Sequence, residues 1–183
     1  MKIYLAGPDV FLPDAVQVGA RKKALCAAFG FEGLYPLDNE LATPTALAIF
    51  DANCRLMRQA DVGMFNLSPF RGPSADAGTA FEVGFLAALG KPLYGYSNNA
   101  ALYGDRVEAA MGATRRNGGW WAADGMSIED FGLQDNLMLD CAIERSGGAA
   151  LARYGDGSTA DMAAMAAFRQ CLEKLAAERG RPK

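Results

Sequence analysis

The sequence predicts an α/β fold, a flavodoxin-like, doubly wound, five-stranded parallel sheet with helices on both faces. Short apolar runs alternate with longer segments of helical pattern over the first hundred residues, and this alternation is typical of a parallel sheet. The apolar runs end at residues that interrupt strands, such as glycine and proline. The 183 residues are enough for one domain with a real core. We therefore expect a single domain over residues 1–183.

The first half is expected to run strand, helix, strand, helix, strand, helix, strand. The apolar run Lys2 to Ala6 stops at Gly7-Pro8, a strong breaker pair, so it is the first strand. Alanine-rich residues 15–29 precede Gly30, which suits the end of a helix. The other elements are strands at 31–37, 62–67 and 91–96 and helices at 45–60 and 79–89. Right-handed connections place the loops after the first and third strands at one edge of the sheet.

The second half has a weaker pattern. Residues 98–128 are glycine-rich and contain both tryptophans, and only 103–111 look helical. A long irregular segment in a compact domain is usually a functional or interface loop. Residues 135–146 and 161–178 are expected to form helices.

Composition excludes several classes of function. The chain has no histidine, which rules out a histidine general base, a histidine triad and every histidine-containing metal site. The net charge is −3 with no basic run, which argues against a nucleic-acid partner. No apolar run reaches the roughly 20 residues that a membrane span requires. Four widely separated cysteines fit buried free thiols in a reducing cytoplasm, where we expect the protein to reside.

The segment from Ser68 to Gly84 organises the candidate site. It joins the third strand to a helix, and ligands of α/β sheets bind at such loops. Asp76 and Glu82 flank the pair Gly78-Thr79, and a glycine there lets the backbone approach a ligand closely. Alternatively, Asp76 simply caps the helix and Glu82 is a solvated helix residue.

The loop after the first strand is expected to lie beside this segment. Its Gly7, Asp9 and Phe11 either form a mere turn or line the same site. In the second case Tyr4 or Asp9 supplies a polar group, and Phe11 supplies a stacking face for a flat ligand. The chain has no GxGxxG or GxxxxGK[ST] motif, so neither a dinucleotide nor a P-loop nucleotide is indicated. We expect no cofactor and no metal.

The two carboxylates suit a neutral ligand rich in hydroxyl groups, since a carboxylate accepts from a hydroxyl and repels a phosphate. A carboxylate can also attack an anomeric carbon and form a covalent glycosyl-enzyme. This chemistry requires no histidine. The residues therefore favour glycosyl transfer or hydrolysis at this site.

Four motifs stand out: IYLAGP at the amino end, PLDN at residues 36–39, DAGTAFEVG at residues 76–84 and the later Asn-Leu-Met at 136–138. Through these motifs the chain resembles the nucleoside 2-deoxyribosyltransferases over roughly residues 1–138. The resemblance implies that the enzyme transfers 2-deoxyribose between nucleobases of 2′-deoxyribonucleosides. It also implies a homo-oligomer in which each active site is completed by a neighbouring subunit.

The resemblance assigns a role to each matching residue. Glu82 would be the nucleophile that attacks C1′, Tyr4 would position it, and Asp76 would bind sugar hydroxyls. Asn136 and Met138 would enter the site of a neighbouring subunit, where the asparagine contacts the 5′-hydroxyl. Ordinary helix positions are the alternative for these two residues.

One position departs from the family pattern. Asn53 stands where the family often has an aspartate that contacts the base and assists its protonation. An amide can bind a base edge, but it cannot deliver a proton as a carboxylic acid does. Asp51 or Asp9 could supply the proton, or it could come from solvent.

Two other functions stay open from the sequence. A hydrolase would let water resolve the same intermediate. A nucleoside-sensing module would be catalytically silent, although it would have no need of the nucleophile.

Overall fold

The computed structural model describes residues 1–39, 44–148, 152–153 and 161–180. Its main sheet has the strand order β2-β1-β3-β4-β8, and every neighbouring pair is parallel. Four strands carry the sheet: β1 (Lys2–Ala6), β2 (Glu32–Leu34), β3 (Val62–Asn66) and β4 (Leu93–Ser97). The two-residue β8 (Ala152–Arg153) pairs with the end of β4. The expected α/β fold with a parallel sheet is confirmed.

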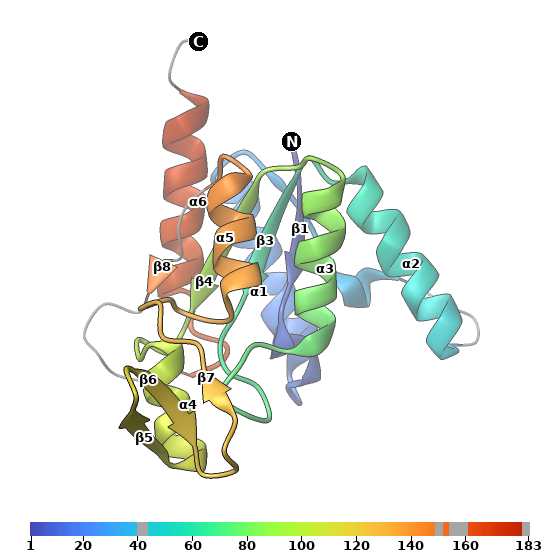
Figure 1. The fold of residues 1–183 in the computed structure, drawn as a ribbon. Helices are drawn as coiled ribbons and strands as arrows, with labels where there is room; N and C mark the ends of the chain where they lie inside the picture. The colour runs from blue at the N-terminus through green and yellow to red at the C-terminus, as the bar shows by residue number, and fades with distance from the viewer. Residues whose placement is uncertain (40–43, 149–151, 154–160, 181–183) are drawn as a thin grey trace.

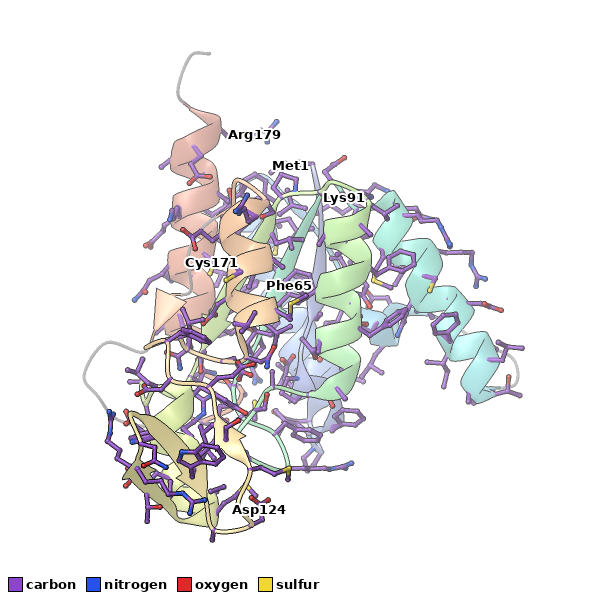
Figure 2. The ribbon with its side chains drawn as sticks, viewed as in Figure 1. Met1, Phe65, Lys91, Asp124, Cys171 and Arg179 are labelled. Carbon is purple, nitrogen blue, oxygen red and sulfur yellow. The ribbon has the colours of Figure 1, made fainter. Side chains whose placement is uncertain are left out.

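Helices cover both faces of the sheet. Successive side chains of a strand point to opposite faces, so the apolar residues of each strand pack against both helical layers. Ile3 and Leu5 of β1 pack with α1 (Ala15–Ala28) and α6 (Ala166–Arg179). Tyr4 and Ala6 pack with a second group of helices, and Phe65 of β3 lies on that side too (Figure 2). That group consists of α2 (Ala46–Gln59), α3 (Ala77–Ala88) and α5 (Leu137–Arg145).

The sheet positions the loops that matter for function. The chain leaves β1 through a short 3-10 helix, η1 (Pro8–Phe11), and leaves β2 through another, η2 (Pro36–Asp38). The loop after β3 leads to α3, which begins immediately after Asp76. Because β1, β2 and β3 are adjacent and parallel, these three loops emerge at the same edge of the sheet.

The expectation that residues 98–128 are mostly irregular is wrong. They form α4 (Tyr103–Met111) and a three-stranded antiparallel sheet of β5 (Ala113–Arg116), β6 (Gly119–Ala122) and β7 (Ser127–Ile128). Figure 1 shows this small sheet beside α4, at one end of the main sheet. Asn117 and Gly118 both have positive φ, at 51° and 74°, as a two-residue hairpin turn requires.

Two arginine–tryptophan contacts connect β5 and β6 of the small sheet. Arg115 pairs with Trp120 across the two strands, and its guanidinium lies 4.5 Å from the Trp120 ring centre. Arg116 lies 5.0 Å from the ring centre of Trp121. Each four-residue strand is too short for a clear alternation, which explains why the sequence pattern did not indicate it. Among the described residues, no helix is both long and apolar enough to cross a membrane.

Candidate active site

Glu82 lies in the second turn of α3, and its side chain leans back toward the helix start, as helical side chains do. Its Oε1 accepts a hydrogen bond from the Tyr4 hydroxyl at 2.5 Å. Tyr4 is fully buried in the centre of β1, so its hydroxyl is held in one position. The second oxygen, Oε2, has no hydrogen-bond partner among the described residues.

The surroundings of Glu82 favour its neutral form. Burial raises the pKa of the Glu82 carboxyl, the hydrogen bond from Tyr4 opposes that rise, and the charge of Asp76 adds to it. The balance raises the pKa of Glu82 from 4.5 to about 7. A carboxylate with this pKa is only weakly solvated, which suits a nucleophile or a general acid.

Glu82 opens into a small pocket of about 140 Å³ at the edge of the sheet. Six of the residues expected in the site line it together, and three further residues complete the wall. The lining residues are Gly7, Val10, Phe11, Pro36, Asn53, Asp76, Gly78, Thr79 and Glu82. They come from the loops after β1 and β2, from α2 and from the first turns of α3.

The backbone conformation of residue 7 and its closeness to β3 both require a glycine there. Its φ is +151°, and a Cβ there would lie 2.4 Å from the Cβ of Asn66. Any side chain would therefore push the loop after β1 away from β3. The glycine keeps the wall of the pocket close to Glu82.

Asp76 both caps α3 and lines the pocket. Its Oδ2 accepts from the backbone N–H of Thr79 at 3.0 Å and from the Thr79 hydroxyl at 3.3 Å. Among the described residues, none donates to its Oδ1. The two interpretations of Asp76 are compatible, since one oxygen holds the helix and the other is available to a ligand.

Phe11 forms one wall and stays 57% exposed. Its ring stacks on Phe70 with the centroids 5.1 Å apart, and the guanidinium of Arg71 lies 4.7 Å from the Phe70 centroid. The sequence did not single out Phe70 or Arg71. Their position in the segment between β3 and α3 was the available signal. The stack presents a flat apolar surface at the pocket mouth.

Asp9 does not line this pocket, which corrects its expected place in the site. Its carboxylate is fully buried and lies 2.6 Å from the Nζ of Lys22. It also accepts from the Tyr35 hydroxyl and from Asn66 Nδ2, both at 3.1 Å. Burial lowers the pKa of Lys22 and the charge of Asp9 opposes that fall. Asp9 of η1 is therefore the centre of a buried polar network that ties η1, α1, the start of η2 and β3 together.

Asp51 is also outside the pocket. It lies exposed on α2, two residues before Asn53, and does not share the face that Asn53 turns to Glu82. Neither carboxylate that the sequence offered as an acid is part of the pocket wall.

Asn136 and Met138 do not reach the Glu82 pocket of their own chain. Asn136 caps α5 by accepting from the N–H of Met138, and its Nδ2 donates to Glu129 at 3.1 Å. Both residues line a separate hollow of about 520 Å³ between α3, α5 and the start of α4. Met138 is 70% exposed.

A buried ion pair, missed from the sequence, holds the segment before Asp76. Arg106 of α4 lies 2.9 Å from Asp135 and donates from Nε to the carbonyl of Pro73. Asp135 accepts from the Ser74 hydroxyl and from the N–H of Ala75. This network, which we call the Arg106 clamp, fixes residues 73–75 immediately ahead of the helix start.

Replacing Asp135 with Asn should lower the free energy of unfolding by about 1–3 kcal/mol, because a buried charged partner of Arg106 is lost. Urea unfolding followed by circular dichroism measures it. Asp130→Asn is the matched control, since Asp130 pairs with Arg115 at an exposed site and its loss should cost less than about 1 kcal/mol. Equal losses in the two variants would contradict the role of the clamp.

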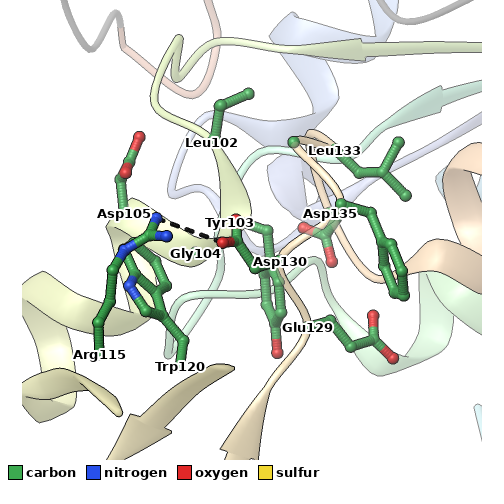
Figure 3. Close-up of a pocket in the computed structure, with 12 residues that line it drawn as sticks. Leu102, Tyr103, Gly104, Asp105, Arg115, Trp120, Glu129, Asp130, Leu133 and Asp135 are labelled. Carbon is green, nitrogen blue, oxygen red and sulfur yellow. Dashed lines mark ion pairs between the residues drawn. The ribbon is translucent and has the colours of Figure 1, made fainter. Parts of the chain in front are cut away.

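A second pocket of about 150 Å³ lies between α4, β6 and residues 129–135 (Figure 3). Its acidic residues are largely engaged within the protein. Asp135 pairs with Arg106, Asp130 with Arg115, and Glu129 accepts from Asn136 and from the N–H of Leu137. Within the described part of the chain, no group of three or more His, Cys, Asp or Glu residues could hold a metal ion. The Glu82 pocket is the stronger candidate.

Comparison with known proteins identifies the family of the chain. Residues 3–138 match the family model described as nucleoside 2-deoxyribosyltransferase. A solved structure described as a 2-desoxiribosyltransferase from Leishmania mexicana is 33% identical, covers 94% of this chain and 97% of its own, and superimposes with a TM-score of 0.65.

Two further proteins are similar. An uncharacterized protein of Schizosaccharomyces pombe is 33% identical over 96% of this chain and 88% of its own. A conserved protein from Enterococcus faecalis is 19% identical, with 98% of both chains covered and a TM-score of 0.57, and it shows the fold alone. The matched region of the family model includes β1, the start of α3 and the start of α5.

Proposed function

Because the chain belongs to the nucleoside 2-deoxyribosyltransferase family, we propose that it transfers 2-deoxyribose between nucleobases through a covalent deoxyribosyl-Glu82 intermediate. The observation that carries this proposal is the hydrogen bond from the buried Tyr4 hydroxyl to Glu82 Oε1, at a pocket that Asp76 also lines. A solvated helix glutamate would have no such partner.

The reaction proceeds in two displacements. Oε2 of Glu82 attacks C1′, the C1′–N bond breaks, and its electron pair leaves with the base. The ring oxygen of the sugar stabilises the positive charge that develops at C1′. A second base then attacks C1′ from the face that the first base left, and the Glu82 carboxylate is released. Two inversions restore the β-anomer, as in retaining glycosyl transfer.

Other residues of the site bind the sugar, stack on the base and position Glu82. The free Oδ1 of Asp76 accepts from a sugar hydroxyl, while its Oδ2 remains bound to Thr79. The exposed ring of Phe11 provides a face on which a base can stack. Tyr4 keeps Glu82 in one rotamer throughout, since its own hydroxyl cannot move within the sheet.

We also propose that the active enzyme is a homo-oligomer. Asn136 and Met138 line a hollow beside α3 that is separate from the pocket of their own Glu82, and we propose that they complete the site of a second copy. Two large apolar side chains, Phe50 of α2 and Phe81 of α3, are about half exposed and form an aromatic pair. Such a patch is typical of a subunit interface. Light scattering of the purified protein tests it.

The test of the proposed activity is base exchange. The protein is incubated with 2′-deoxyinosine and free adenine, and the products are separated by chromatography. Appearance of 2′-deoxyadenosine demonstrates transfer. Hypoxanthine without a new nucleoside would demonstrate hydrolysis, and no turnover of any purine or pyrimidine donor would overturn both enzymatic functions.

The pH dependence of transfer should follow the ionisation of Glu82. Because only the carboxylate attacks C1′, kcat/KM should rise with pH through about 7 and then reach a plateau. Tyr4→Phe removes the hydrogen bond that lowers the pKa of Glu82, so the rising limb should move to higher pH. A pH profile of initial rates measures both. Tyr94→Phe, on the other face of the sheet and outside the pocket, should leave the limb in place.

A further inference from the structure

We propose that Asn53 is a fixed hydrogen-bond donor to the nucleobase, held in one orientation by Asn39, and that the base leaves as a hydrogen-bonded anion. This inference rests on the proposed function and specifies how its leaving group is recognised and stabilised. It concerns the one pocket position where a carboxylic acid was expected from the family resemblance.

The orientation of the Asn53 amide follows from a chain of three groups. Asn39 Nδ2 donates to the carbonyl oxygen of Pro36 at 2.8 Å and to Oδ1 of Asn53 at 3.3 Å. If the Asn39 amide turned over, its oxygen would face the Pro36 carbonyl, and two acceptors would meet. If the Asn53 amide turned over, two NH₂ groups would meet. The carbonyl of Pro36 thus sets Asn39, and Asn39 sets Asn53.

The turn that carries this carbonyl is itself rigid. Pro36 begins η2, where its ring restricts the backbone. Asp38 accepts from the N–H of Tyr35 at 3.1 Å through Oδ2, and its Oδ1 lies 2.5 Å from Lys23 Nζ. The motif of residues 36–39 therefore has a physical role, which is to fix the direction of an amide in α2.

As a result, the Nδ2 group of Asn53 faces the pocket as a hydrogen-bond donor, while its Oδ1 is bound to Asn39. Among the described residues, none accepts from Asn53 Nδ2, while Asn53 lines the pocket together with Glu82. A base that occupies the pocket satisfies this N–H only if it presents a lone pair, such as a ring nitrogen or a carbonyl oxygen. A base edge with a C–H or an N–H at that point leaves a donor unpaired.

Within the part of the chain that the structure describes, the pocket wall has no separate acid for the leaving base. Asp76 and Glu82 are the titratable side chains among the described lining residues, and under the proposed function these bind the sugar and form the covalent bond. Asp9 is enclosed with Lys22, and Asp51 lies outside. When the C1′–N bond breaks, its electron pair stays on the base, the N–H of Asn53 stabilises the developing charge, and water then supplies the proton. In exchange, the incoming base returns a proton to water, so the reaction balances.

The test begins with binding, which requires no turnover. Titration calorimetry compares hypoxanthine with its 1-deaza, 3-deaza and 7-deaza analogues, each of which replaces one ring nitrogen by C–H, and with purine, which lacks the 6-oxygen. One substitution should weaken binding to the wild type about tenfold, since an unpaired donor costs about 1–3 kcal/mol. That loss should disappear in Asn53→Ala and shrink in Asn39→Ala, whose role is only to position Asn53. The inference fails if no analogue shows a difference that depends on Asn53.

Single-turnover kinetics provide the second readout. The rate of base release from a series of 2′-deoxyribonucleosides should fall steeply as the departing base becomes more basic, because no acid assists it. Asn53→Asp introduces an acid, so this dependence should become shallower at low pH. Asp51→Ala should leave the dependence unchanged, and a steeper dependence in that variant would identify Asp51 as the acid and overturn the inference. Absence of turnover with every donor would count against the proposed function, whereas the binding comparison would still decide the role of Asn53.

Discussion

Replacing Glu82 with Gln should reduce the rate of base release from 2′-deoxyinosine by at least about 10³-fold, because the variant cannot form the covalent bond to C1′. The substitution retains an oxygen that accepts from Tyr4, so the pocket keeps its shape. Single-turnover assays with enzyme in excess measure the effect. Glu173→Gln on the exposed face of α6 is the control and should keep full activity.

The same substitution should stabilise the fold at alkaline pH. Because the pKa of Glu82 rises from 4.5 to about 7 on folding, the stability that it contributes falls as the pH rises between these values and stays low above them. Glu82→Gln removes the cost of the buried charge. Its free energy of unfolding should exceed that of the wild type by up to about 3 kcal/mol at pH 8, with little difference at pH 4.5. A variant that is inactive and also less stable at pH 8 would contradict this account.

Replacing Asp9 with Ala should lower the free energy of unfolding by about 3–5 kcal/mol, because it leaves the Lys22 ammonium buried without its partner. Tyr35 and Asn66 lose an acceptor at the same time. Urea unfolding at pH 6 measures the loss. Asp14→Ala breaks the exposed pair with Arg21 and should cost less than about 1 kcal/mol, which makes it the matched control.

The effect of Asp9→Ala should also depend on pH in a defined direction. Without Asp9, burial favours the neutral amine of Lys22 in the folded state, whereas the unfolded chain keeps the amine charged to higher pH. The unfolded state then binds more protons, so the stability of the variant rises with pH. Its deficit relative to the wild type should therefore be smaller at pH 9 than at pH 6. An equal deficit at both values would mean that Lys22 is not the residue left unpaired.

Much of the pocket could be expected from the sequence because its parts lie close together along the chain. Asp76, Gly78 and Glu82 belong to one loop and one helix start, and a right-handed α/β fold brings Gly7 and Phe11 to the same edge. The strand order explains why Tyr4 can reach Glu82, which is 78 positions away. Their roles in the reaction stay predictions.

Other parts could not be expected because they depend on partners from distant segments. Asp9 looks like a loop carboxylate until Lys22, Tyr35 and Asn66 are placed around it. The Arg106 clamp likewise joins α4 to Asp135, 29 positions later. The dipeptide Asn117-Gly118 is a local signal for a hairpin turn. The strands on either side of it are too short to show an alternating pattern, so the hairpin could not be predicted from the sequence.

The placement of both tryptophans in β6 has a practical consequence for spectroscopy. Trp120 and Trp121 are the only tryptophans of the chain, so intrinsic emission excited at the red edge originates entirely in the small antiparallel sheet. Trp120 is nearly buried and packs against Gly104 of α4, whereas the main sheet contributes only tyrosine signals. Fluorescence thus monitors the small sheet, while far-ultraviolet circular dichroism monitors the helices around the main one. If the two unfolding curves coincide, the small sheet and the main sheet unfold as one cooperative unit. If the curves differ, the small sheet and α4, which contains Arg106, have a stability of their own.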